Sequence, residues 1–204
     1  QRLFSGSGFR SWLHMARFLW LNKAIKKYNI NCDSVIELGC YDGKSINYLS
    51  NFPDNYIGYD ANWENGLDIF KKSWLNNFNY QAYICNSLEE FNPHNQSFNL
   101  AICMETLEHL PRNDMPNYIN KLVNSYNQYL IITVPNEIGI VFFLKYFFKL
   151  IISFLVKEKI QRYTFLEVIY QTLGMTNKVE QNDHKGFNYK KLIIELEKST
   201  NIVK

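Results

Sequence analysis

Glu105, Glu108 and His109 are the residues whose types and spacing best suit proton transfer or metal binding. They follow residues 98–103, an apolar run typical of a buried strand. An imidazole titrates near neutral pH, so His109 could take a proton from a hydroxyl group, although it could instead hold its loop through hydrogen bonds. If the segment is helical, the i, i+3 and i+4 spacing places the three side chains on one face. With His184 they could then bind a divalent cation.

A second candidate site is the glycine turn that follows residues 34–38, a run that includes Glu37. An apolar run bounded by glycine is typical of a buried parallel strand. Gly39 and Gly43 permit a positive φ and let a ligand approach the main chain. Their G-x-x-x-G spacing is not the G-x-G-x-x-G dinucleotide fingerprint, and the turn also lacks the frame of a phosphate-binding P-loop. A tight strand-to-helix turn without a ligand remains the alternative.

The third candidate is Asp60, which ends the strand-like run 56–60. It lies about 20 residues beyond the glycine turn, where a carboxylate can accept hydrogen bonds from both hydroxyls of a ribose. The same side chain could instead cap the helix that is expected to follow. Open α/β sheets bind ligands at the carboxyl ends of their central strands, so we expect the glycine turn at that edge.

Five strands and several helices are expected to position these residues. The patterns predict strands at 34–38, 56–60, 80–85, 98–103 and 129–134, and helices at 10–28, 43–50, 63–75, 114–127 and 188–198. The chain of 204 residues, 47% of them apolar, suits a single α/β domain with a substantial core. At most one short strand is expected after the last helix.

Charge and cysteine content narrow the function classes. The net charge of +3 is too small to indicate nucleic-acid binding. None of the four cysteines belongs to a C-x-x-C pair, so we expect buried free thiols in a reducing cytosol. No cleavable signal peptide is visible, and a cytoplasmic location is expected.

Residues 138–156 form a very apolar stretch in which Lys145, Lys149 and Ser153 recur every four residues. On a helix these polar residues make one narrow stripe, and two lysines in mid-segment argue against a membrane-spanning helix. The favoured interpretation is a buried core or lid helix. A dimer contact and a peripheral membrane contact, with the lysines at the lipid headgroups, remain open. Because a second helical pattern follows, residues 138–183 are expected to form a helical insertion on the substrate side.

Two segments carry a resemblance to a known family. The pattern E-x-G-x-x-x-G from Glu37 to Gly43 resembles motif I of class I S-adenosylmethionine-dependent methyltransferases. Residues 105–109 resemble the E-x-x-E-H that follows the fourth strand in many of these enzymes, and residues 133–137 resemble the turn after the fifth strand. The resemblance implies a Rossmann-like, doubly wound, mostly parallel sheet with helices on both faces. It also implies that residues 1–30 form a helical cover over the cofactor.

The resemblance assigns roles to individual residues. Those expected to bind S-adenosylmethionine are Glu37, Gly39, Cys40, Gly43, Asp60, Ala61, Asn86, Ser87, Leu88 and Met104. In the family, the segment matching Asn86–Leu88 contacts the adenine amine and packs on the adenine ring. Asn86 or Ser87 could also cap a helix, and the two roles are compatible. The expected catalytic residues are His109 and Glu105.

The resemblance implies methylation of an oxygen atom on a small-molecule, glycan or lipid-linked acceptor. One alternative is a metal-dependent O-methyltransferase, similar to the small-RNA 3′-end or ubiquinone-pathway enzymes, with Glu105, Glu108, His109 and His184 as ligands of a divalent metal. Another is a module that binds S-adenosylmethionine without catalysis. A nucleotide-dependent oxidoreductase is disfavoured because the glycine spacing does not match.

Overall fold

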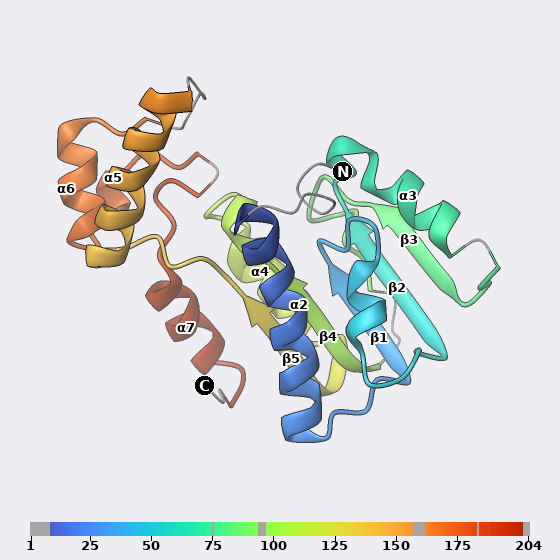
Figure 1. Ribbon diagram of the computed structural model, residues 1–204. Coiled ribbons are helices and arrows are strands. Elements are labelled where there is room, and N and C mark those ends of the chain that lie inside the picture. Colours follow the sequence, from blue (N-terminus) through green and yellow to red (C-terminus); the bar gives the residue numbers. More distant parts are fainter. Residues whose placement is uncertain (1–8, 75, 94–96, 157–161, 183, 202–204) are drawn as a thin grey trace. The chain divides into compact units, whose positions relative to one another are not determined.

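A computed structural model describes residues 9–74, 76–93, 97–156, 162–182 and 184–201 (Figure 1). It contains a five-stranded, wholly parallel sheet with the strand order β3-β2-β1-β4-β5. The strands are β1 Ser34–Leu38, β2 Asn55–Asp60, β3 Tyr80–Ile84, β4 Phe98–Met104 and β5 Tyr126–Thr133. This arrangement confirms the expected doubly wound α/β fold. The strand order reverses between β1 and β4, which is the point where such sheets bind ligands.

Helices cover both faces of the sheet because successive side chains of its central strands, which point to opposite faces, are buried. On one face, α2 (Phe9–Tyr28) and α3 (Gly66–Ser73) belong to the same buried cluster as Val35 of β1. On the other face lies α4 (Met115–Val123), where the ring of Tyr118 stacks on Phe91 at 5.7 Å between centroids. The predicted helix 10–28 is therefore confirmed as an element that covers the sheet.

Three predicted helices differ from the observed ones. Residues 43–50 form only a 3₁₀ turn, Lys44–Tyr48, because Leu49 already has an extended backbone. The helix predicted at 63–75 begins as a 3₁₀ turn, Trp63–Asn65, and becomes α-helical only at Gly66. The helix predicted at 114–127 is α4, which ends at Val123, so that β5 begins three residues earlier than predicted.

The chain divides into two compact units, residues 1–107 with 114–133 and residues 108–113 with 134–204. The second unit contains α5 (Gly139–Val156), α6 (Phe165–Thr172), a 3₁₀ turn (Thr176–Lys178) and α7 (Tyr189–Glu197). The helical character predicted for 138–156 and 188–198 is thus confirmed. The short strand allowed after α7 would fall largely on residues 202–204, outside the described part.

Two further expectations can be compared with the structure. The expectation that 138–156 is a buried helix is wrong for one side of α5, where nine apolar side chains between Ile140 and Ile152 are exposed. All four cysteines are buried free thiols, as predicted. Among the residues that the structure describes, no helix combines the length and apolarity needed to cross a lipid bilayer.

Candidate active site

The glycine turn after β1 has a backbone that only glycine accommodates at two positions. Gly39 and Gly43 have φ angles of 81° and 69°, in the left-handed region. A Cβ atom on Gly39 would overlap the side chain of Thr106, and one on Gly43 would lie 2.5 Å from the Phe70 ring. The turn therefore brings bare main chain to the carboxyl end of β1, as its sequence predicts.

Asp60 fixes the shape of this turn from the end of the neighbouring strand. Its carboxylate accepts hydrogen bonds from the backbone N–H of Tyr41, at 2.9 Å, and of Asn62, at 2.7 Å. Burial raises the pKa of the Asp60 carboxyl, and the two hydrogen bonds oppose that rise. The bond to Asn62 N–H resembles the capping role that the sequence left open. The carboxylate therefore lies beside the glycine turn, where a ribose contact is still a prediction.

Glu37 is buried in the middle of β1 and forms the floor of the turn. Its carboxylate accepts hydrogen bonds from the hydroxyl of Tyr56, at 2.5 Å, and from that of Ser45. Burial raises the pKa of Glu37 from 4.5 to about 7, despite these bonds and the nearby Arg17, which all lower it. A cation that binds next to Glu37 would therefore favour the loss of its proton near neutral pH.

This raised pKa predicts a stability profile. Between pH 4.5 and about 7 the folded protein keeps a proton on Glu37 that the unfolded chain has lost, so stability falls as pH rises through this window. The Glu37→Gln variant should show a smaller fall in melting temperature over the same window. Thermal melts at several pH values measure this, with Glu64→Gln, an exposed glutamate of the same unit, as control. Parallel curves for Glu37→Gln and wild type would contradict the assignment.

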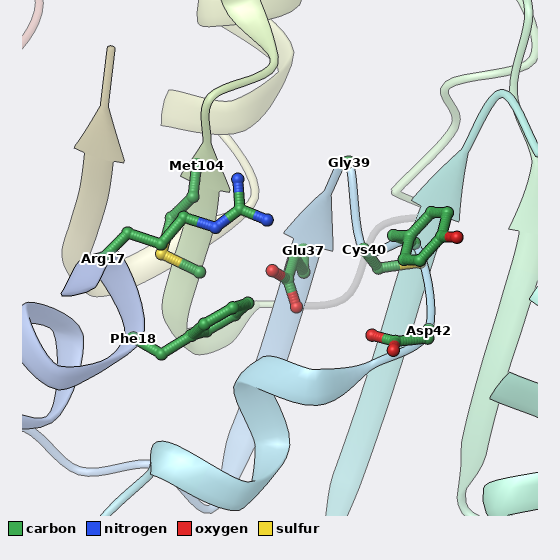
Figure 2. Close-up of a pocket in the computed structure, with 8 residues that line it drawn as sticks. Arg17, Phe18, Glu37, Gly39, Cys40, Asp42 and Met104 are labelled. Carbon is green, nitrogen blue, oxygen red and sulfur yellow. The ribbon is translucent and has the colours of Figure 1, made fainter. Parts of the chain in front are cut away.

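A pocket opens above Glu37 (Figure 2). Its lining residues are Arg17, Phe18, Glu37, Gly39, Cys40, Tyr41, Asp42 and Met104. Figure 2 shows Arg17, Phe18 and Met104 on one side of Glu37, with Cys40 and Asp42 on the other. The pocket therefore offers one cationic and two acidic side chains around exposed main chain.

The pocket includes four of the residues predicted to bind the cofactor and four that the sequence reasoning missed. Glu37, Gly39, Cys40 and Met104 were predicted, whereas Arg17, Phe18, Tyr41 and Asp42 were not. The sequence holds little signal for Arg17 and Phe18, because no clear apolar stripe along α2 marks the side that faces the sheet. The other pair lies inside the G-x-x-x-G turn itself.

The remaining predicted residues lie along the same edge of the sheet but do not line this pocket. Ala61 follows Asp60, and the segment Asn86–Leu88 follows β3, the strand paired with β2. The Lys121 ammonium of α4 donates to the carbonyl of Leu88 at 2.6 Å and so fixes this segment. Its residues form turns rather than a helix, so no helix is present for Asn86 to cap.

A second cluster, within the other compact unit, consists of Glu108, His109 and His184. Glu108 is 1% exposed, and its Oε1 lies 3.9 Å from His109 Nε2 and 3.8 Å from His184 Nδ1. The two imidazole rings meet edge to face with centroids 4.8 Å apart. One ligand atom from each of the three residues falls within 4.8 Å of the others. The structure thus brings together residues 75 positions apart in the sequence, as the metal alternative requires.

Hydrogen bonds between two loops hold this cluster in place. The guanidinium of Arg112 donates to the carbonyls of Thr176, at 3.2 Å, and Gly186, at 3.0 Å. The side chain of Gln181 accepts from the Arg112 N–H at 2.9 Å and donates to the Leu110 carbonyl at 2.8 Å. The loop that carries His109 is therefore hydrogen-bonded to residues on both sides of His184 in the sequence, Gln181 and Gly186.

Glu105 was grouped with Glu108 and His109 on the condition that their segment is helical, and this condition is not met. The φ of Glu105 is 51°, and the only helical turn in the segment is the 3₁₀ turn Leu107–His109. Its backbone N–H donates to the Thr133 carbonyl at 2.8 Å, which continues the pairing of β4 with β5. The helical spacing argument for Glu105, Glu108 and His109 is therefore wrong, and its catalytic role stays a prediction from resemblance alone.

A family model described as a methyltransferase domain matches residues 9–174. The methyltransferase domain of bacterial CtHen1 matches at 17% identity and a TM-score of 0.56, over 92% of this chain and 86% of that one. Magnesium protoporphyrin IX methyltransferase from Synechocystis PCC 6803, with bound SAM, matches at 17% identity and a TM-score of 0.51, over 67% of this chain and 69% of that one.

A third solved structure is an S-adenosylmethionine-dependent methyltransferase from Clostridium acetobutylicum ATCC 824. It matches at 16% identity and a TM-score of 0.48 over 57% of this chain, and the match spans 48% of that protein. A search among curated proteins found no match. At 17% identity, the CtHen1 and Synechocystis structures show only that the fold is shared. The family model, which covers residues 9–174, shows that the chain belongs to the methyltransferase-domain family.

Proposed function

We propose that this chain, which belongs to the methyltransferase-domain family and is an S-adenosylmethionine-dependent methyltransferase, methylates an oxygen atom. The acceptor we propose is a small-molecule, glycan or lipid-linked alcohol. Support comes from the buried carboxylate of Glu108 beside the imidazole of His109. Alcohols are poor nucleophiles and need a base that removes their proton, and an imidazole can serve as that base.

The residues around the glycine turn suit the parts of the cofactor. Arg17 would pair with the carboxylate of the methionine moiety, and Glu37 or Asp42 with its ammonium group, because the pocket presents both charges. Asp60 would accept from the ribose hydroxyls with the lone pairs that its two backbone bonds leave available. Asn86–Leu88, at the end of the next strand, would contact adenine. Bound S-adenosylmethionine supplies the electrophilic methyl group, and the protein positions the acceptor for in-line displacement.

The experiment that tests this function is transfer of label from methyl-tritiated S-adenosylmethionine to an alcohol and to the amine of the same carbon skeleton. A base-dependent site should transfer label to the alcohol, with a rate that rises as the base loses its proton. Preferential labelling of the amine would overturn the assignment to oxygen. Tight cofactor binding without transfer to any acceptor would instead favour the non-catalytic binding module.

A second candidate function, metal-assisted O-methylation, is favoured by the convergence of Glu108, His109 and His184. One carboxylate and two imidazoles are a donor set that suits Zn²⁺ or Mn²⁺. Ligand atoms that share one such ion lie about 3–3.5 Å apart, closer than the 3.8 and 3.9 Å separations from Glu108 and the 4.8 Å within which all three ligand atoms fall. The two imidazoles would therefore have to move toward each other to share an ion. A bound ion would lower the pKa of an acceptor hydroxyl.

For this second candidate, removal of metal with a chelator should abolish turnover and add-back of Mn²⁺ or Zn²⁺ should restore it. His184→Ala should lower the affinity for the added ion by about 10–100-fold, measured by calorimetry on the metal-free protein. Lys178→Ala, a cation from the same unit, serves as the control. Full activity in chelator would leave His109 acting as a base without metal.

A further inference from the structure

The outer face of α5 is apolar across its whole exposed width. Nine apolar side chains between Ile140 and Ile152 are 40–64% exposed, whereas Phe142 and Tyr146 are buried on the opposite side. With 100° per residue, the exposed positions span about 200° of the helix circumference. A surface this wide and this apolar marks an interaction site rather than an ordinary solvent-facing helix.

The neighbouring helix α6 also exposes apolar side chains. Phe165, Leu166 and Leu173 at its ends and first turn are 58–79% exposed. The ring of Tyr163 packs on both Phe142 and Tyr146 at 5.0 Å between centroids, and the Tyr146 hydroxyl accepts from the Tyr163 N–H at 3.1 Å. Tyr163, which lies just before α6, thus attaches the start of that helix to α5, and the two helices run next to each other in Figure 1.

The sequence that contains α5 and α6 is biased in charge. Residues 138–178 contain six basic and two acidic residues, a net charge of +4, while the whole chain carries +3, so the remainder totals −1. The only charged residues of α5 are Lys145 and Lys149. On the helical wheel Lys145 borders the apolar face and pairs with the Glu137 carboxylate at 2.5 Å, whereas Lys149 is exposed and lies about 60° beyond that edge. A partner for this face therefore has to tolerate apolar insertion and carry negative charge.

We infer that this apolar and basic face of α5 and α6 binds the surface of a lipid bilayer that contains anionic lipids. The exposed phenyl rings and aliphatic chains enter the boundary between headgroups and acyl chains, with α5 parallel to the membrane plane. The net positive charge of residues 138–178 attracts anionic headgroups, and the long side chain of the exposed Lys149 extends toward them. A second copy of the chain is disfavoured, because a two-fold contact through α5 would bring two segments of net charge +4 together.

Co-sedimentation with vesicles tests this inference. The full chain should bind phosphatidylcholine vesicles containing about one third phosphatidylglycerol, and bind them less in high salt or without the anionic lipid. Replacing Phe147 and Phe148 together by serine should weaken binding by at least about tenfold. The Lys149→Gln variant should weaken it by about fivefold, and only for the anionic vesicles.

A matched control removes two exposed phenylalanines elsewhere. Phe52→Ser with Phe78→Ser alters side chains that are 65% and 90% exposed in the other compact unit, and it should leave vesicle binding unchanged. Unchanged cofactor affinity shows that each variant is folded. Absence of binding to anionic vesicles at low salt would overturn the inference. So would an equal loss in the control, or a dimer in sedimentation velocity that only the Phe147 and Phe148 variant loses.

Discussion

Replacing His109 by alanine should lower the turnover of methyl transfer by about 10²–10⁴-fold, the usual contribution of a general base. The imidazole is the candidate base because it lies in the segment that follows β4, with the buried Glu108 carboxylate 3.9 Å from its Nε2 atom. Affinity for S-adenosylmethionine should stay within about twofold of wild type, because no cofactor contact is assigned to His109. Single-turnover rates with labelled cofactor, together with calorimetric titration, separate the two quantities.

The matched comparison is His184→Ala, which removes the other imidazole of the same cluster. If His109 acts as a base without metal, this variant should lose far less activity than His109→Ala. If the cluster holds an ion, the two variants should lose similar activity and both should lose metal affinity. A fully active His109→Ala enzyme would contradict both roles and leave the histidine as a support for its loop.

Replacing Asp60 by alanine should raise the dissociation constant for S-adenosylmethionine by about 10–100-fold, the value of losing a hydrogen bond to a charged group. Two effects act together. The variant loses the predicted ribose acceptor, and it releases the Tyr41 N–H that the carboxylate holds at 2.9 Å. The maximal rate should change little once the cofactor is saturating, because Asp60 is not assigned to the reacting atoms.

Asp54→Ala provides the control for this prediction. Asp54 is an exposed aspartate that precedes β2, at the end of the strand opposite Asp60. It should leave cofactor affinity unchanged. An unaltered dissociation constant in Asp60→Ala would mean that the carboxylate serves only to shape the turn. Titration with adenosine, which keeps the ribose but lacks the amino-acid part, should show a loss similar to that with the full cofactor.

The central strands could be predicted from the sequence because β1 and β4 are mostly apolar runs, whereas the edge strands β3 and β5 also carry polar, exposed residues and the start of β5 was predicted three residues late. Both faces of the parallel sheet are buried, so β1 and β4 leave little ambiguity. Helix boundaries were less predictable because they depend on single backbone conformations. The positive φ angles of Asn62, Glu64 and Asn65 delay the start of α3, and no apolar spacing reports them.

The candidate site was predictable where its residues are adjacent in sequence and unpredictable where folding joins distant ones. Gly39, Gly43 and Asp60 could be located because strand ends meet at one edge of a parallel sheet. Arg17 escaped prediction because its approach to Glu37 depends on how α2 packs. Glu105 was grouped with the histidines by assuming a helix that its φ of 51° prevents.

The proposed function requires that the glycine turn and Asp60 bind S-adenosylmethionine. A crystal structure with S-adenosylhomocysteine, the product that lacks only the methyl group, measures this directly. We expect the amino-acid part at the Gly39–Gly43 turn beside Arg17, and the ribose hydroxyls within hydrogen-bonding distance of the Asp60 carboxylate. Density for the product at another edge of the sheet, with the pocket above Glu37 empty, would contradict it.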